Sequence, residues 1–487
     1  MLYDLDNTDY KTIREKEKQI RFLESEFDDN NVSNKHFSND VTAWLINHQA
    51  MLYGEIILHT IKYFEENSSC SELVMFDHVL VDEYQDLNKA EQRMIDLISK
   101  HGSLVVIGDD DQSIYSFKHA YPDGIREFDK SHDNCSDHVF TECRRCPKTV
   151  IEKASRLIRH NTNHSPKEFT PYQENQIGEL NELISETLIE EVNKISGIIN
   201  TEREKINLCD FLVLAPTRNV TDGLQNKLHE LNIPSKSFFK ENILKTDQLK
   251  KAFSMLNLLV TPEDIISLRY LLGLGGDKFR TKSYRRVLNY ASEQGLTINK
   301  VLEKLVAKDI NIPYVHRLVQ IYSDIKCELQ KLRASVADTP MKLSSILVDD
   351  ASENREFIEL LNIAICENAS PDDIGLDEWL RRIYKDISKL ITLPENIIKG
   401  DFVKLMSLHS SKGLSAKCVI IIHIVERRLP REPFGLKEYY QKYVEEQRRL
   451  FYVAITRCKG NQPDYSGKLI ISTVEGKESR FIKELDI

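Results

Sequence analysis

The chain has 487 residues, of which 41% are apolar and 29% are charged, and its formal net charge is −10. This length and composition predict a globular protein of roughly three domains, at about 150 residues each. The negative charge excludes a basic field over the whole molecule, so a nucleic-acid site would have to be a local groove. The apolar runs are too short to span a membrane, and the charged N-terminus is not a signal peptide. Together with nine cysteines, this predicts a cytoplasmic protein with reduced thiols and no membrane partner.

The first 70 residues predict helices. Residues 13–27 are rich in Lys, Arg and Glu and have few apolar positions, which indicates a solvated helix or a tail. Residues 28–39 are polar and predict a loop. Residues 44–64 carry apolar side chains at helical spacing, which predicts a helix packed against the rest of the protein.

A short strand is predicted at residues 79–81, and two carboxylates follow it directly. The three strand residues are apolar and two of them are β-branched, whereas Asp82 and Glu83 come next. Ligands of α/β sheets bind at strand ends. There, one carboxylate can hold Mg²⁺ and the other can take a proton from a water that attacks a phosphate. Taken alone, the pair also fits an acidic surface turn.

A second strand is predicted at residues 103–107, after a helix at 91–100, so these elements form a βαβ unit with parallel strands. The segment DDDQSIY follows the second strand. Its Gln112 can hydrogen-bond a terminal phosphate. Tyr115 and Phe117 can offer ring faces on which unpaired bases stack, or they can be core residues of a loop.

A second α/β pattern begins at residue 139. Arg144 and Arg145 are adjacent cations shortly before a predicted helix, and they can bind phosphate or form a plain solvated pair. Cys143 and Cys146 form the only CxxC of the chain, and no second pair at zinc spacing accompanies them, which favours structural thiols over a metal site. The predicted elements that follow are a helix at 150–160, a strand at 210–215 and helices at 220–231 and 249–260.

From residue 262 to about 398 no strand pattern is convincing, which predicts an all-helical insertion. Its predicted helices span residues 265–272, 284–293, 298–308 and 318–334. The strand pattern then resumes. The closing elements are strands at 402–408 and 418–423, a long helix at 438–454 and a strand at 469–473.

Two further polar sets lie in this last region. The loop between its first two strands carries His409 and Lys412 and can hold phosphate or a nucleic-acid backbone, although a solvated turn fits as well. The long helix runs into Thr456 and Arg457, whose guanidinium can reach a phosphoryl group from a second domain. The alternative is a cation that stabilises a helix C-terminus.

In this order, the polar sets resemble the motifs of the UvrD/Rep-like helicases of superfamily one. The segments that carry the resemblance are VDEYQD, GDDDQSIY, CRRCP, the H-x-x-K-G-L loop, LFYVAITR and SRFIKEL. The resemblance runs from about residue 45 to the end of the chain. It implies an α/β fold with two RecA-like parallel-sheet domains, the first truncated, and a helical accessory insertion in the second. The implied segments are a helical remnant of the first-domain insertion (1–70), the truncated first domain (71–138), the second domain in two parts (139–261 and 401–487) and the helical insertion (262–400).

The resemblance also implies roles at a site for ATP and Mg²⁺. Asp82 is similar to the Mg²⁺ ligand of the family, and Glu83 to the base that activates water. Gln112 resembles the sensor of the γ-phosphate. Arg145 and Arg457 resemble the two arginines that reach the γ-phosphate.

For DNA, Tyr115 and Phe117 are similar to the positions that stack on single strands. His409 and Lys412 are similar to the loop residues that contact the strand and link it to the nucleotide. The activity implied is ATP-dependent 3′-to-5′ unwinding, with single-stranded or partly duplex DNA as the partner.

One part of the family pattern is missing from the sequence: the P-loop, G-x-x-x-x-G-K-[ST], whose backbone amides cradle the phosphates. Gly54 is the only glycine before the carboxylate pair. The nearest imitation, residues 273–278, follows a predicted helix rather than a strand, and Phe279 replaces the hydroxyl residue. We therefore expect a chain that begins inside a longer ancestral sequence and has little or no ATPase activity alone.

Without the strands of a P-loop region, the predicted strands 79–81 and 103–107 would lack neighbours and leave an apolar face exposed. Two alternatives stay open. The chain can be half of a split helicase whose P-loop comes from a separate chain, or it can be a non-catalytic nucleic-acid-binding module.

Overall fold

The computed structural model describes residues 35–165, 167–239, 243–244, 246–273, 278–351, 354–392, 400–432, 440–460 and 465–486. The predicted helix or tail at 13–27 and most of the glycine-rich segment 273–278 lie outside these residues. The chain divides into two compact units, one formed by Met1–Leu58 with Glu241–Ile397 and the other by His59–Lys240 with Ile398–Ile487. We call them the helical unit and the sheet unit. Among the described helices, none is both long and apolar enough to cross a lipid bilayer.

The sheet unit begins with the βαβ element that the sequence predicts. Strand β1 (His78–Val81) pairs in parallel with β2 (Ser103–Val106), and helix α4 (Lys89–Ser99) connects them. Helix α4 starts at a capping box in which Asn88 accepts from the backbone amide of Glu91 and the Glu91 carboxylate accepts from the amide of Asn88. The predicted parallel pair is therefore confirmed.

One face of this two-stranded sheet carries exposed apolar side chains, and we call it the bare face. Leu80 and Val105 are register partners, and their side chains are 70% and 47% exposed. Ile107, directly after β2, is 46% exposed. The alternate residues of β1 and β2, whose side chains point to the other face of the sheet, are half-buried. The expectation of an exposed apolar face is thus confirmed for the described residues, although parallel sheets normally have both faces covered.

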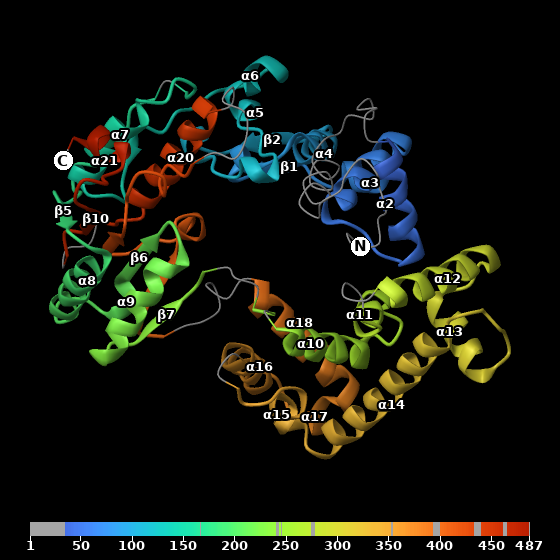
Figure 1. Ribbon diagram of the computed structural model, residues 1–487. Helices are drawn as coiled ribbons and strands as arrows, with labels where there is room; N and C mark the ends of the chain where they lie inside the picture. Colours follow the sequence, from blue (N-terminus) through green and yellow to red (C-terminus); the bar gives the residue numbers. More distant parts are fainter. Residues whose placement is uncertain are drawn as a thin grey trace. The chain divides into compact units, whose positions relative to one another are not determined.

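The larger sheet has six parallel strands. Their order is β5 (Glu179–Ser185), β10 (Lys468–Val474), β9 (Cys418–Ile421), β6 (Phe211–Ala215), β8 (Val403–Ser407) and β7 (Ser235–Ser237). Helices α8 (Leu188–Glu202) and α9 (Arg218–Glu230) cover one face, and α7 (Lys148–Ile158), α20 (Tyr440–Ile455) and α21 (Arg480–Leu485) cover the other, as Figure 1 shows. A short parallel pair, β3 (Glu142–Cys143) with β4 (Thr170–Pro171), lies ahead of this sheet in the chain.

Alternation along the central strand β6 divides the core of the larger sheet. Phe211, Val213 and Ala215 are buried with α8 and α9, whereas Leu212 and Leu214 are buried with α7 and α20. All five residues are fully or almost fully buried. A continuous apolar run flanked by helices on both sides is typical of a central parallel strand.

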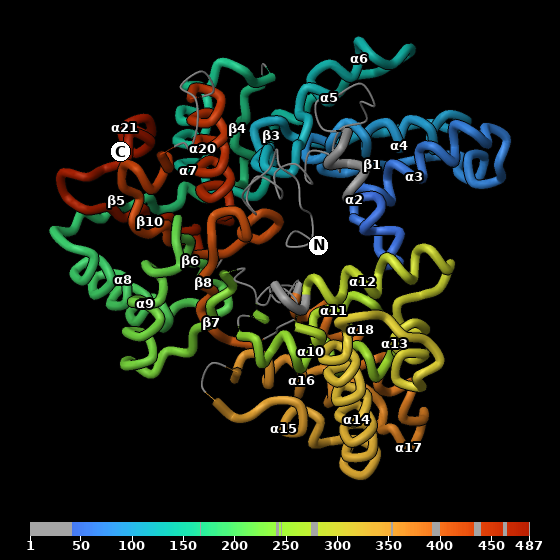
Figure 2. Tube along the Cα trace, turned by 45° about the vertical axis from the view of Figure 1, so that its right-hand side comes forward, coloured from blue at the N-terminus to red at the C-terminus, as the bar shows by residue number. Residues whose placement is uncertain are grey.

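The helical unit has no strand among its described residues, as the sequence predicts. Figure 2 traces the path of its labelled helices. Its helices are α2 (Lys35–Asn47), the first turn of α3 (Tyr53–Glu66), α10 (Asp247–Val260), α11 (Ile265–Leu271), α12 (Lys278–Gln294), α13 (Ile298–Ala307), α14 (His316–Asp338), α15 (Leu343–Leu347), α16 (Arg355–Glu367), α17 (Pro371–Ile374) and α18 (Leu376–Thr392). The predicted single helix at 44–64 is wrong, because the chain leaves the helix after Asn47 and Gln49 adopts a left-handed conformation with φ 48°.

The end of α2 is held by contacts within the helical unit. His48 Nε2 lies 2.8 Å from the hydroxyl of Tyr284 on α12, and the ring of Trp44 stacks on that of His48. The Arg269 guanidinium lies over the Trp44 ring, 5.4 Å from its centre. Residues 1–58 therefore group with the helical unit rather than with the β1–β2 sheet.

Candidate functional site

The carboxylates predicted after β1 stand at the end of the small sheet. Asp82 and Glu83 are both exposed, and the Glu83 amide donates to Asp82 Oδ1 at 2.9 Å. Glu83 adopts φ 54°, a left-handed conformation that reverses the chain and begins a short 3₁₀ turn. The exposed Asp82 carboxylate is a hard oxygen ligand, and this donor suits Mg²⁺.

Gln85 joins the two strand ends. Its amide nitrogen donates to Glu83 Oε2 at 2.6 Å, and its amide oxygen accepts from the backbone of Asp109 at 3.0 Å. The side chain is completely buried. A Cβ on Gly108 would lie 2.2 Å from Gln85 Oε1, so this hydrogen bond requires glycine at position 108. Sequence reasoning missed Gln85, because a glutamine inside a charged turn carries no pattern of its own.

Gln112 lies at the centre of the polar network. Its amide nitrogen donates to Asp109 Oδ2 at 2.8 Å, and its amide oxygen accepts from Arg457 Nη2 at 3.5 Å. Its backbone carbonyl accepts from Lys412 Nζ at 2.9 Å. The structure therefore brings three predicted site residues, Gln112, Lys412 and Arg457, into one hydrogen-bonded group.

Lys412 connects this group to the carboxylates. Its ammonium lies 2.6 Å from Asp86 Oδ2 and 3.3 Å from Glu83 Oε2, and its side chain is only 8% exposed. It also lies over the Tyr115 ring, 5.4 Å from the centre. In the structure Lys412 thus faces the carboxylates rather than solvent.

Arg145 and Arg457 lie close enough to repel each other. Burial, and then the charge of Arg145, lower the pKa of Arg457 to about 10. Arg457 is 2% exposed, and its Nε donates to the carbonyl of Val453 at 2.9 Å. Within the described part of the chain, the buried Nε of Arg145 has no hydrogen-bond partner. Two neighbouring guanidiniums, of which Arg145 has a donor without a partner, fit an anion such as a phosphate group of ATP.

The predicted stacking residues form an aromatic group beside this network. The rings of Tyr115 and Phe117 meet edge to face at 5.7 Å, and Phe117 meets His409 at 6.0 Å. Phe117 is 46% exposed, and burial lowers the pKa of His409, which keeps its ring neutral at pH 7. Ser116 donates from its backbone to Glu446 on α20 at 3.1 Å, which ties the loop to the larger sheet.

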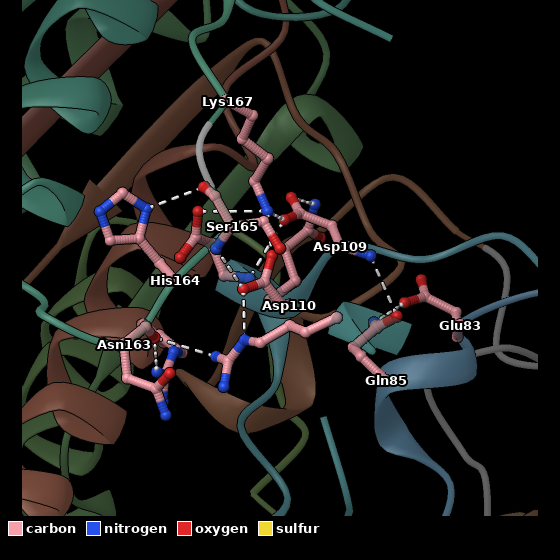
Figure 3. A network of polar contacts seen from close by, with 12 residues as sticks. Glu83, Gln85, Asp109, Asp110, Asn163, His164, Ser165 and Lys167 are labelled. Carbon is pink, nitrogen blue, oxygen red and sulfur yellow. Dashed lines mark hydrogen bonds and ion pairs between the residues drawn. The ribbon is translucent and has the colours of Figure 1, made fainter. Parts of the chain in front are cut away.

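A further cluster, which sequence reasoning missed, surrounds Lys167 (Figure 3). Its ammonium pairs with three consecutive aspartates: at 2.5 Å with Asp109, at 3.3 Å with Asp111, and also with Asp110. Arg126 Nε donates to Asp110 at 2.7 Å. Among the described residues these aspartates are the one cluster with metal-ligand geometry, but the Lys167 ammonium already supplies the cation.

Asp110 also forms a hydrogen bond with the backbone that precedes Lys167. Its Oδ2 accepts from the backbone amide of Ser165 at 2.8 Å. Arg126, which pairs with Asp110, donates to the carbonyl of Asn163 at 2.9 Å. Figure 3 shows that these groups converge on the loop that follows β2. Asn163, Ser165 and Lys167 are therefore bound to the loop that carries Gln112, directly or through Arg126.

Two family models match the chain. The UvrD/REP helicase N-terminal domain matches residues 4–133, and the UvrD-like helicase C-terminal domain matches residues 139–473. The second match alone covers more than half of the chain.

Similar proteins include ATP-dependent DNA helicases of bacteria. PcrA of Bacillus subtilis (strain 168) is 24% identical over 471 residues, which cover 92% of this chain and 63% of that protein. Rep of Buchnera aphidicola is 26% identical over 409 residues, which cover 78% and 61%. PcrA of Staphylococcus aureus (strain Mu50) is 24% identical over 430 residues, which cover 85% and 58%. The chain spans about three fifths of the length of these relatives. By the two family matches, the chain belongs to the UvrD-like helicase family.

Proposed function

We propose that the chain is the ATP-hydrolysing and DNA-contacting part of a cytoplasmic ATP-dependent 3′-to-5′ DNA helicase of the UvrD/Rep type. The observation that carries the proposal is the single polar network that joins Glu83, Gln112, Lys412 and Arg457. Its members come from the small sheet, from the loop after β8 and from the end of α20. An arrangement of this kind can couple phosphate chemistry to movement between the parts.

The roles follow from the chemistry of each side chain. Asp82 would hold Mg²⁺, which when bound supplies positive charge to the phosphate oxygens. Glu83 is an exposed carboxylate beside it and would accept the proton of the attacking water. Gln112 would sense the terminal phosphate, and Arg145 and Arg457 would stabilise its charge in the transition state.

The DNA contact would lie on the aromatic group. Phe117 presents an exposed ring, and Tyr115 and His409 lie next to it. Stacking of a base on such rings is worth about 1–3 kcal/mol and tolerates any sequence. Lys412 lies beside Tyr115 and also pairs with Glu83. A base stacked there would therefore act on the lysine that touches the catalytic carboxylate.

We further propose that a second polypeptide segment with a P-loop covers the bare face of the β1–β2 sheet. The support is the exposed row of Leu80, Val105 and Ile107 on a parallel sheet, because parallel sheets normally have both faces covered. The carboxylates at the same sheet end would attract the positive charges of a P-loop and its ions. Without that segment the phosphates lack stabilisation worth several kcal/mol, so the chain alone would turn over little ATP.

Replacing Glu83 with glutamine tests the proposed chemistry. We expect background ATP turnover from the chain alone with single-stranded DNA. Addition of a polypeptide that carries a P-loop should give DNA-stimulated turnover, which Glu83→Gln should lower by about 10²–10⁴-fold because the general base is lost. The measurement is phosphate release, with DNA affinity from fluorescence anisotropy as the control, which should not change. Robust turnover that survives Glu83→Gln would refute the assignment of the base.

Replacing Leu80 with aspartate tests the bare sheet face. Because Leu80 is 70% exposed, the free energy of unfolding of the isolated chain should change by no more than about 0.5 kcal/mol. Association with the P-loop polypeptide should nevertheless be lost, as measured by analytical ultracentrifugation. Ile189→Asp is the matched control, since Ile189 is 76% exposed on α8 of the larger sheet. If both variants bind the polypeptide equally well, the β1–β2 face is not the docking surface.

A further inference from the structure

The turn between β3 and α7 carries two thiols with different surroundings. Cys143 ends β3 and is half-buried, whereas Cys146 is 1% exposed and lies two residues before α7. Cys146 Sγ donates to the carbonyl of Thr456 at 3.3 Å. The pair therefore consists of one reachable and one enclosed thiol at the start of an eleven-residue helix.

The turn is held in shape by its neighbours. The buried side-chain amide of Asn175 donates to the carbonyl of Cys143 at 2.6 Å and to that of Cys146 at 2.9 Å. Pro147, the next residue, is enclosed by glycines: a Cβ on Gly460 would lie 2.4 Å from Pro147 Cγ. Because one amide binds both cysteine carbonyls, the backbones of the two cysteines are kept near each other.

The pKa values of the two thiols are shifted in opposite directions. The neighbouring Cys146 side chain, followed by the backbone amides of Cys146 and Arg145 and the charge of Arg145, lowers the pKa of Cys143 to about 6 against the opposing effect of burial. The Cys143 side chain, together with burial, raises the pKa of Cys146. Within the described residues, Arg145, Tyr452 and Arg457 are charged or titratable side chains that interact electrostatically with the pair. Cys143 is thus the thiolate and Cys146 the proton-bearing partner.

We infer that Cys143 and Cys146 form a redox-active dithiol, in which Cys143 attacks low-molecular-weight disulfides and Cys146 resolves the product. A metal site is not supported, because in the described part of the chain no third ligand accompanies the two thiols. The inference does not depend on the proposed function. It assigns a reversible modification site to the turn that carries Arg145.

The reaction balances without a further reagent. The Cys143 thiolate attacks one sulfur of the small disulfide, and the other half leaves as a thiolate. Cys146 then gives up its proton, and its sulfur attacks Cys143 Sγ and expels the second half. The two cysteines lose two electrons and the one proton that Cys146 carried, and the small disulfide becomes one thiolate and one thiol. An accessible attacking thiolate and an enclosed second thiol are the arrangement that this sequence of steps requires.

The first test measures alkylation of each cysteine in the reduced full-length chain, with iodoacetamide at several pH values and peptide mass spectrometry. Cys143 should reach half of its maximal rate near pH 6. In the urea-unfolded chain the same residue should do so near pH 8.5. Cys146→Ala should move the folded midpoint upward, because the Cys146 side chain is the largest cause of the low value and alanine has no donor. Equal midpoints for Cys143 in the folded and unfolded chain would overturn the inference.

The second test incubates the chain with oxidised glutathione. The peptide that spans residues 143–146 should lose the mass of two hydrogen atoms and carry no glutathione. Cys146→Ser should stop at a glutathione adduct on Cys143, and Cys143→Ser should give neither product. Cys135→Ser, at an exposed cysteine elsewhere, is the matched control and should leave the disulfide yield unchanged. A lasting adduct on Cys143 in the unaltered chain would show that Cys146 cannot resolve it, and the inference would be wrong.

Discussion

Replacing Lys167 with methionine is expected to lower the free energy of unfolding by about 3–5 kcal/mol, because removal of one partner leaves buried charges uncompensated. The side chains of Asp110 and Asp111 are each 2% exposed, and Lys167 pairs with both. Methionine keeps most of the volume and removes only the charge. The measurement is urea unfolding followed by far-UV circular dichroism. Tryptophan fluorescence is not suitable for this measurement. Both tryptophans, Trp44 and Trp379, lie in the helical unit, whereas Lys167 lies in the sheet unit.

Lys130→Met is the control for the Lys167 variant. Lys130 is 70% exposed and pairs with Glu127 at 3.2 Å, so its loss should change the free energy of unfolding by no more than about 0.5 kcal/mol. A second change, Asp111→Asn, should restore part of the loss in Lys167→Met because it removes one unpaired charge. If the Lys167 and Lys130 variants are equally stable, the cluster does not hold the loop after β2.

The pH response of Asp111→Asn alone has a definite sign. Burial raises the pKa of Asp111 from 3.8 to about 6, so the folded chain binds this proton more tightly than the unfolded chain. The stabilising contribution is complete below about pH 4 and is lost as the pH rises through 6. Asparagine cannot ionise, and the variant should therefore be more stable than the unaltered chain at pH 8 but not at pH 4.

Several site residues could be predicted from the sequence because they lie at or near the ends of predicted strands. Asp82 and Glu83 follow directly after one predicted strand and Gln112 lies five residues after the other, and strand ends on the same side of a parallel sheet must meet. No local sequence pattern identifies Lys167, because its partners Asp109, Asp110 and Asp111 lie more than 50 residues earlier in the chain. The available signal was on the partners: three consecutive aspartates cannot be buried without a cation. Finding that cation required the tertiary structure.

The fold shows the same division between local and long-range information. The central strands β6 and β9 are continuous apolar runs and were predicted. In the larger sheet, the strands that the sequence did not reveal, β5 and β7, are the two edge strands. An edge strand is partly exposed and can carry polar residues, as the segments ELNELIS and SKS do, so it has no apolar run to recognise.

Replacing Arg457 with glutamine is expected to lower the DNA-stimulated ATP turnover of the complex with the P-loop polypeptide by about 10³-fold or more, because an arginine finger acts on the charge of the transition state. Arg457 donates to the side chain of Gln112 and lies next to Arg145. Arg457→Lys should recover stability but little turnover, since an ammonium lacks the planar fork of the guanidinium. The measurements are kcat and KM for ATP together with DNA affinity, and only kcat should fall strongly.

Arg448→Lys separates catalysis from packing in this test. Arg448 is a buried arginine within α20 that pairs with Glu484 at 2.6 Å and also donates to Asn161. Its substitution should lower the free energy of unfolding, because a buried pair is weakened. It should change kcat by only a few fold. Comparable losses of kcat in the Arg448 and Arg457 variants would mean that Arg457 acts through the packing of the α20 terminus. A loss confined to Arg457 would place its guanidinium at the phosphate.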